Sequence, residues 1–230
     1  EYTSYQYEIL DMLDLSHLQA YMIRTPTKFS KVYVSEPGYI LARAFCIKHI
    51  NRIGVVNPEK VEIGKKTYVS RSKLEKRGGA KNEIVLENKL RKEGWNIFHP
   101  QDHSVAHQLK ELSSSETICG IAGSAFHSFI LLKELKSRII LISRPMDLPL
   151  DFCLLPFVKR IEQVVVDFSG LYRECESHFF LRRGLLDIEK LVGKINSLVD
   201  ESCFECSEQE DGFKRFGSYS EYVDWLDASS

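Results

Sequence analysis

The sequence lacks several features that would place it in a specialised class of protein. No apolar run approaches the roughly 20 residues that a membrane-spanning helix needs. The net charge of −1 argues against a dedicated nucleic-acid-binding protein, because such proteins usually carry an excess of positive charge. Six cysteines are widely spread, and the one Cys-x-x-Cys pair, Cys203 and Cys206, has no second pair or nearby histidine to complete a zinc site. We therefore expect reduced cysteines and a cytoplasmic location, with association at the inner face of a membrane left open.

Two further features are absent from the sequence, a dinucleotide-binding motif and an initiator methionine. No Gly-x-Gly-x-x-Gly follows a predicted strand, which ranks a Rossmann-type oxidoreductase low. The sequence starts at Glu1 without an initiator methionine, so we expect a longer parent protein. With 43% hydrophobic and 27% charged residues, the composition is that of an ordinary globular protein.

Short apolar runs alternate with segments of helical periodicity over most of the chain. The runs are centred near residues 67, 96, 118, 140 and 165, and the helices are predicted at 82–92, 104–112 and 187–200. Asn82 and Ser104 suit the N-cap positions of the first two helices, and Gly94 suits the position after the end of the first. Continuous apolar strands between helices predict a parallel sheet covered on both faces. The fold class is therefore α/β, with a Rossmann-like doubly wound domain.

The predicted domain boundaries follow changes in composition. Asn57-Pro58 separates residues 1–57, which we interpret as the remnant or end of an N-terminal α/β domain, from the Rossmann-like domain at 58–200. Within the first part, a strand is predicted at 31–35 and a helix at 41–52. Residues 201–230 are predicted to be an acidic linker and a C-terminal helix.

The stretch from Glu116 to Lys136 is the most informative part of the chain. An apolar strand leads into Gly123-Ser124-Ala125, and helical spacing follows as far as Lys136. Small residues allow a sharp turn and a close approach by a ligand. If Ser124 caps the helix, free N–H groups would face an anion such as phosphate. A tight strand-to-helix turn without a ligand is equally compatible with this stretch.

Positive charge is concentrated near the same predicted edge. Residues 60–81 hold eight basic and two acidic side chains, whereas residues 200–230 hold nine acidic and two basic ones. Ligands of open parallel sheets bind beyond the carboxyl ends of the strands. Arg71, His99, Gly123 and Arg144 would all lie at that edge, although a solvated basic face would give the same pattern.

An ordered series of motifs resembles glycosyltransferase family 61. The series runs from Tyr68 to Leu132, with a weaker likeness through residues 1–60. Ser128 departs from it, because the family usually has asparagine there. The motifs are Tyr68-Val69-Ser70-Arg71-Ser72, Arg77 followed by Asn82-Glu83, Gly94-Trp95-Asn96-Ile97, Ser104 to Gln108, and Gly123-Ser124-Ala125-Phe126-His127-Ser128.

The resemblance implies an inverting transferase of the GT-B arrangement, which moves a sugar from a nucleotide-sugar to a glycan acceptor. It resembles the bacterial branch that builds capsular polysaccharide, and it implies association with other polysaccharide-biosynthesis proteins. The chain would hold the C-terminal, nucleotide-binding half and only part of the acceptor-side domain. No cofactor or metal is expected, because GT-B enzymes hold the diphosphate with cationic side chains and the sequence contains no Asp-x-Asp.

The resemblance also assigns the candidate donor- and phosphate-binding residues. They are Arg71, Arg77, Glu83, Gln108, Gly123, Ser124, Ala125 and His127. An arginine at a strand end can bind two phosphate oxygens at once. The catalytic base is unknown, because GT-B enzymes usually supply it from the N-terminal domain.

A non-catalytic transferase-like module that binds a partner protein or a glycan is the main alternative. Ser128 and the incomplete acceptor side favour it, whereas Arg71 and the Gly-Ser-Ala-Phe-His run favour the enzyme.

Overall fold

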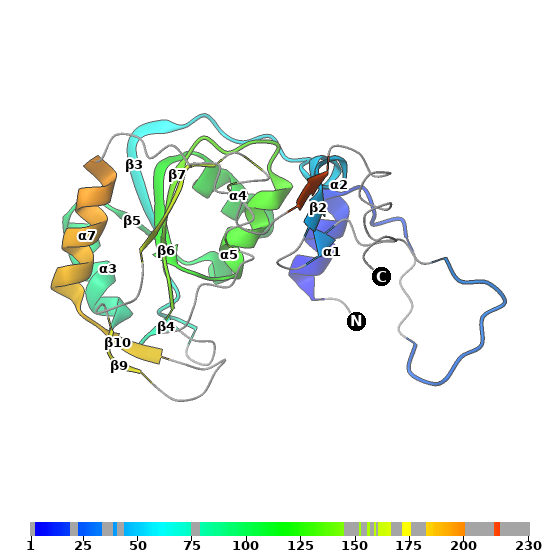
Figure 1. Ribbon diagram of the computed structural model, residues 1–230, viewed down its shortest axis with the longest axis horizontal. Coiled ribbons are helices and arrows are strands. Elements are labelled where there is room, and N and C mark those ends of the chain that lie inside the picture. Colours follow the sequence, from blue (N-terminus) through cyan, green and yellow to red (C-terminus); the bar gives the residue numbers. More distant parts are fainter. Residues whose placement is uncertain are drawn as a thin grey trace.

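A five-stranded parallel sheet with helices on both faces forms the centre of the computed structural model (Figure 1). The strand order is β5-β3-β6-β7-β8, and all four pairings are parallel. These strands coincide with the five apolar runs, so the predicted α/β sheet is confirmed. They are β3 (Glu62–Val69), β5 (Asn96–Phe98), β6 (Ser115–Ile121), β7 (Arg138–Ile142) and β8 (Gln163–Val166).

The structure describes most of the central region and parts of both terminal regions. The described residues are 3–18, 23–33, 39–40, 44–74, 79–144, 161–166, 172–175, 183–200 and 214–216, together with Phe152, Pro156 and Lys159.

Each face of the sheet has its own apolar core. Helices α3 (Glu83–Lys92) and α7 (Ile188–Asp200) cover one face, and α4 (Val105–Ser113), α5 (Ser124–His127) and the 3-10 helix η2 (Ser128–Leu131) cover the other (Figure 1). Successive residues of a strand point to opposite faces. Accordingly, Ile118 belongs to the α4 core, and Cys119 belongs to the α3–α7 core.

The helix ends show which local predictions hold. Ser104 caps α4 by accepting a hydrogen bond from the His107 amide at 3.2 Å. Gly94 follows α3 with a φ of 82°, a left-handed conformation that glycine adopts at little cost. Asn82 is the N-cap residue of α3, as predicted, but its side chain does not cap the helix. The Asn82 amide instead donates to the Leu186 carbonyl and accepts from the Leu186 N–H, both at 2.9 Å.

Two small three-stranded sheets flank the central one, and the sequence pattern did not predict them. One has the order β4-β10-β9, and the other has the order β1-β2-β11. Strand β11 lies within the segment interpreted as a linker, and the C-terminal helix predicted after it lies outside the described residues. The bounds are β4 (Gly79–Ala80), β9 (Tyr172–Cys175), β10 (Arg183–Leu186), β1 (Tyr39–Ile40), β2 (Ala44–Cys46) and β11 (Lys214–Phe216).

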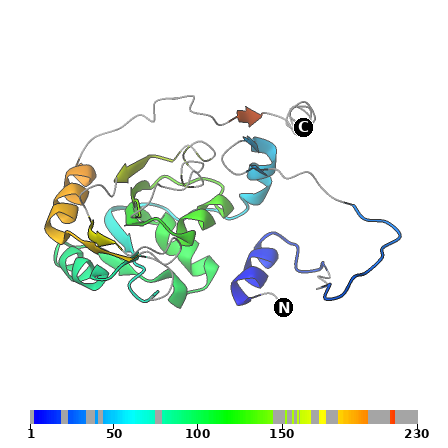
Figure 2. The ribbon, with the colours of Figure 1, turned by 60° about the horizontal axis from the view of Figure 1, so that its bottom comes forward.

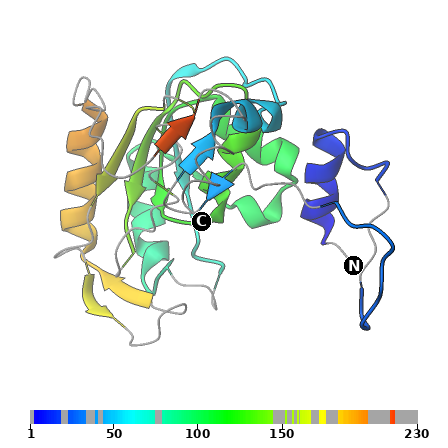
Figure 3. The same cartoon turned by 45° about the vertical axis from the view of Figure 1, so that its right-hand side comes forward.

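Helix α1 of the N-terminal region is attached to the central domain through α4. Figure 3 shows α1 (Ser4–Met12) beside α4, where the Glu8 carboxylate accepts a hydrogen bond from the Val105 N–H at 2.6 Å. Residues 23–33 then extend away from the sheet (Figure 2), and residues 31–33 form no strand, contrary to the prediction. The helix predicted at 41–52 begins only with α2 (Ile47–Ile53), because residues 44–46 pair as β2. The 3-10 helix η1 (Pro100–Asp102) lies between β5 and α4.

Gly120 allows β3, β6 and the turn after β6 to pack closely. It lies opposite Val69 in the β3–β6 pairing. A Cβ at Gly120 would lie 2.7 Å from the Val69 carbonyl oxygen and 3.1 Å from Cζ of Phe126. The backbone oxygen cannot move without shifting the strand, so this position has no room for a methyl group.

We expect Gly120→Ala to lower the free energy of unfolding by about 1–3 kcal/mol, the usual cost of overpacking a core. Gly193→Ala is the matched control, since a Cβ at Gly193 in α7 would meet nothing within 4 Å. That change is expected to stabilise the protein by about 0.5–1 kcal/mol through helix propensity. Urea unfolding measures both values, and equal stabilities for the two variants would contradict this packing.

Candidate functional site at the carboxyl ends of the strands

The parallel pairing brings two arginines to either side of one turn. Strands β3 and β7 are the two neighbours of β6. Arg71 follows β3 by two residues, Arg144 follows β7 by two residues, and Gly123 follows β6 by two residues. Since parallel strands end at one edge, all three positions lie at the same rim, as the sequence predicted. We call Arg71, Gly123 and Arg144 the arginine rim.

The Arg71 guanidinium lies directly against the Gly123 backbone. A Cβ built on Gly123 would lie 2.0 Å from Nη1 of Arg71 and 3.0 Å from its Cζ. Arg71 is only 8% exposed. The φ of Gly123 is −165°, an extended conformation that any residue can adopt. Glycine at this position therefore makes room for the arginine, and the backbone conformation does not require it.

Arg144 holds the other side of the turn. Its Nε donates a hydrogen bond to the Ala122 carbonyl at 2.7 Å, and the Ala122 N–H donates to the Ile142 carbonyl at 2.9 Å. The residue before Gly123 is thus fixed both by the end of β7 and by the arginine that follows it. Arg144 was placed at this edge from the sequence but was not among the predicted binding residues.

The turn leads into a shorter helix than predicted. Gly123, and not Ser124, is the N-cap residue, and α5 ends at His127 before the chain tightens into η2. The helix does not reach Lys136, because residues 131–133 pair with Val56. The Val56 N–H donates to the Leu131 carbonyl, and the Lys133 N–H donates to the Val56 carbonyl. A single turn has a small macrodipole, so most of the positive charge at the rim comes from the guanidinium groups.

The remaining residues of the turn differ in exposure. Ser124 and His127 are exposed, and Ala125 is half-buried. The His127 ring stacks on Phe152 with 4.5 Å between ring centroids. Ser128, where the family usually has asparagine, donates its hydroxyl hydrogen to the Ala125 carbonyl and so closes the turn from within.

Glu83 lies behind the arginine rim and not on its surface. One carboxylate oxygen, Oε1, accepts hydrogen bonds from the Arg71 N–H at 2.9 Å and from the Tyr68 hydroxyl at 3.0 Å. Glu83 is 1% exposed, and burial raises the pKa of its carboxyl group even though the nearby Arg71 charge and both hydrogen bonds oppose that rise. Glu83 therefore supports the backbone of Arg71.

Glu87 is a second buried carboxylate that the sequence reasoning missed. It lies one helical turn after Glu83 and is 4% exposed. It accepts a hydrogen bond from the Ser70 hydroxyl at 2.6 Å, and its Oε2 lies 3.9 Å from Nε2 of His99. Acidic residues four apart, flanking Leu86 on an otherwise apolar helix face, are the signal that could have identified the pair.

Gln108 and Arg77 are two further predicted binding residues, and like the others they stay untested as ligand contacts. The Gln108 amide nitrogen donates to the carbonyls of Pro100 and His103 at 2.8 and 3.0 Å, which fixes the loop between β5 and α4. Arg77 lies outside the described residues. Contacts between either residue and a donor remain predictions.

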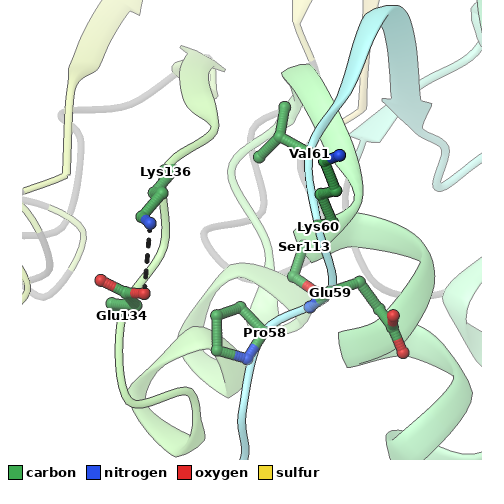
Figure 4. Close-up of a pocket in the computed structure, with 7 residues that line it drawn as sticks. All are labelled: Pro58, Glu59, Lys60, Val61, Ser113, Glu134 and Lys136. Carbon is green, nitrogen blue, oxygen red and sulfur yellow. Dashed lines mark hydrogen bonds and ion pairs between the residues drawn. The ribbon is translucent and has the colours of Figure 1, made fainter.

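A hollow at the opposite end of the sheet is separate from this site. It has a volume of about 470 Å³, and it lies where the chain enters β3, β6 and β7 (Figure 4). Its walls carry Glu59, Lys60, Glu134 and Lys136, and Lys136 pairs with Glu134 at 3.5 Å. None of the predicted donor-binding residues that the structure describes lines it.

The family of the chain follows from comparison with protein-family models. The model described as Glycosyltransferase 61 matches residues 7–144, more than half of the sequence, and includes the arginine rim. The chain belongs to glycosyltransferase family 61. A search of curated proteins gave no match. Among the residues that the structure describes, no helix of this family member is long and apolar enough to cross a membrane.

We expect Gly123→Ala to displace the Arg71 guanidinium without unfolding the protein. The methyl group would occupy the place of Nη1, and the end of a flexible side chain can move away. The cost should be near the low end of the about 1–3 kcal/mol typical of overpacking. The Nε–Hε resonance of Arg71, assigned with Arg71→Lys, should shift in NMR spectra of Gly123→Ala and stay in place in Ser124→Ala. An unchanged resonance in Gly123→Ala would contradict this contact.

Proposed function

We propose that this family member is an inverting, metal-independent glycosyltransferase that moves a sugar from a nucleotide-sugar to a glycan or polysaccharide acceptor. The contact between the Arg71 guanidinium and the Gly123 turn, within the family-matched region, carries the proposal. The proposed reaction uses the nucleotide-sugar donor and no further cofactor.

The chemistry of the leaving group explains this choice of residues. When the sugar leaves, negative charge develops on the nucleotide diphosphate and must be stabilised. Arg71 can bind two phosphate oxygens at once. Ser124 and Ala125 begin α5, and the first N–H groups of a helix point out of its amino end towards an anion. Arg144 holds the turn that presents these groups.

The wider arrangement is part of the same proposal. The central sheet would be the donor-binding half of a GT-B pair, and residues 1–57 would belong to the acceptor side. The catalytic base would come from that side, as the acceptor hydroxyl must lose a proton during an inverting transfer. A cytoplasmic role in making a bacterial-type capsule, with other polysaccharide-biosynthesis proteins as partners, fits this reaction.

A non-catalytic transferase-like module is the second candidate. The Ser128 contact favours it, because the Ser128 hydroxyl binds the Ala125 carbonyl within the turn. An asparagine could instead have reached a ligand from that position. Nucleotide binding separates the two candidates.

A thermal-shift screen with UDP, GDP, CMP and ADP tests the proposal. We expect at least one of these nucleotides to raise the melting temperature, because a ligand that binds only the folded state stabilises it. A chelator should leave that shift unchanged. If none of the four nucleotides stabilises the protein, the non-catalytic module becomes the better account.

Arg71→Ala should weaken binding of the stabilising nucleotide about 10- to 100-fold, since a hydrogen bond to a charged group contributes about 1.5–3 kcal/mol. Lys73→Ala is the matched control, because Lys73 carries the same charge two residues along the chain and its side chain is 53% exposed. Equal losses in the two variants, measured by calorimetry, would indicate a diffuse basic surface and would contradict a specific arginine site.

A further inference from the structure

The two oxygens of the Glu83 carboxyl group, behind the arginine rim, have different surroundings. Its Oε1 accepts two hydrogen bonds, whereas its Oε2 is buried from solvent and has no hydrogen-bond partner within the described part of the chain. A charged carboxylate oxygen that is buried without a donor costs free energy, and protonation lowers that cost because it removes the charge.

The charged groups around Glu83 come from two elements. Arg71, at the end of β3, favours the ionised carboxylate, and Glu87, on the same helix α3, disfavours it. Tyr68, also on β3, favours the ionised form through its hydroxyl group. Oε2 of Glu87 in turn lies 4.0 Å from Nη2 of Arg91 and 3.9 Å from Nε2 of His99, and burial lowers the pKa of the His99 imidazole. Burial raises the pKa of the Glu83 carboxyl group, and the Arg71 charge opposes that rise together with the hydrogen bonds from the Arg71 N–H and the Tyr68 hydroxyl.

The same arginine is the proposed phosphate ligand. When a diphosphate binds Arg71, its negative charge compensates the guanidinium and also repels the carboxylate behind it. Both effects disfavour ionised Glu83. The neutral acid can still accept the Arg71 N–H and Tyr68 hydroxyl bonds through Oε1, so the backbone of the rim keeps its shape.

We propose that Glu83 positions Arg71 and takes up a proton when a diphosphate binds at the arginine rim. This inference rests on the proposed function, because it requires the diphosphate to bind there. It changes the role predicted for Glu83, from a ligand of the donor to a buried partner of the arginine. It also makes donor affinity depend on pH through a residue that does not touch the donor.

The direction of the pH effect follows from the sign of the proton exchange. Binding that takes up a proton becomes tighter as pH falls through the range in which Glu83 is ionised in the free protein and neutral in the complex. Glu83→Gln mimics the neutral acid. We therefore expect Glu83→Gln to bind more tightly than the wild type at pH 8, by roughly threefold or more, and to lose that advantage at lower pH.

Calorimetry can count the protons directly. Titrations of inorganic pyrophosphate, UDP, GDP and ADP, each in two buffers of different ionisation enthalpy, give the protons taken up per ligand bound. The ligand's own protonation is the same for every variant and cancels in the difference between them. Wild type should take up more protons than Glu83→Gln. Glu134→Gln, which removes an exposed carboxylate at the opposite end of the sheet, should match the wild type.

Tyr68→Phe provides a second test that keeps Glu83 in place. Removing the hydroxyl donor favours the neutral acid before the ligand arrives, so proton uptake on binding should fall while binding remains. If Glu83→Gln does not fold, the comparison of Tyr68→Phe with the wild type still tests proton uptake on binding.

The outcomes separate the two proposals. If a ligand binds but proton uptake is the same in the wild type, Glu83→Gln and Tyr68→Phe, the inference about Glu83 is overturned and the proposed function stands. If none of the four ligands binds the wild type, the inference is overturned, and if CMP does not bind either, the proposed function is overturned with it. A merely structural role for Glu83 would change stability without changing the number of protons taken up.

Discussion

The contact between Arg71 and the Gly123 turn depends on the parallel register of β3 and β6. Val69 lies opposite Gly120 in that register, so the two strands end together and the residues after them meet. A shift of one residue would turn the side chains that follow to the other face of the sheet. Gly120 permits the close approach of the strands, and Gly123 leaves room for the guanidinium. One structural constraint thus connects the core of the domain with its proposed chemistry.

Burying the charged Arg71 side chain costs free energy, and two carboxylates on α3 offset part of that cost. Arg71 is 8% exposed and needs a fixed backbone if its guanidinium is to stay at the turn. The Glu83 carboxylate provides that support through the Arg71 N–H, and the Glu87 carboxylate does the same for the Ser70 hydroxyl one residue earlier. Two buried acids beside one buried base give an electrostatic balance that an arriving anion would change.

The central sheet was predictable because its signals are local. Unbroken apolar runs define strands that are covered on both faces, and Gly94 and Ser104 have the conformations and contacts that their residue types favour. The predicted edge also holds, since Arg71 and Gly123 meet there. The family resemblance pointed to the same residues, and the match over residues 7–144 confirms the family.

Contacts between segments far apart in sequence account for most of the differences. The helix after Gly123 stops early because Val56 pairs with residues 131–133, and the side chain of the N-cap residue Asn82 binds Leu186 instead of capping α3. The resemblance predicted Glu83 as a ligand, and its burial behind Arg71 depends on how α3 packs on β3. Periodicity and spacing contain no information about such distant partners.

A double-mutant cycle between Arg71→Ala and Gly123→Ala, read out by calorimetry with pyrophosphate, tests the central contact most directly. If the glycine serves to leave room for the arginine, the double variant should bind about as weakly as Arg71→Ala alone, because the methyl group then displaces nothing. Losses that add across the two variants would mean that the two residues act independently, and would contradict a binding role for the contact between Arg71 and Gly123.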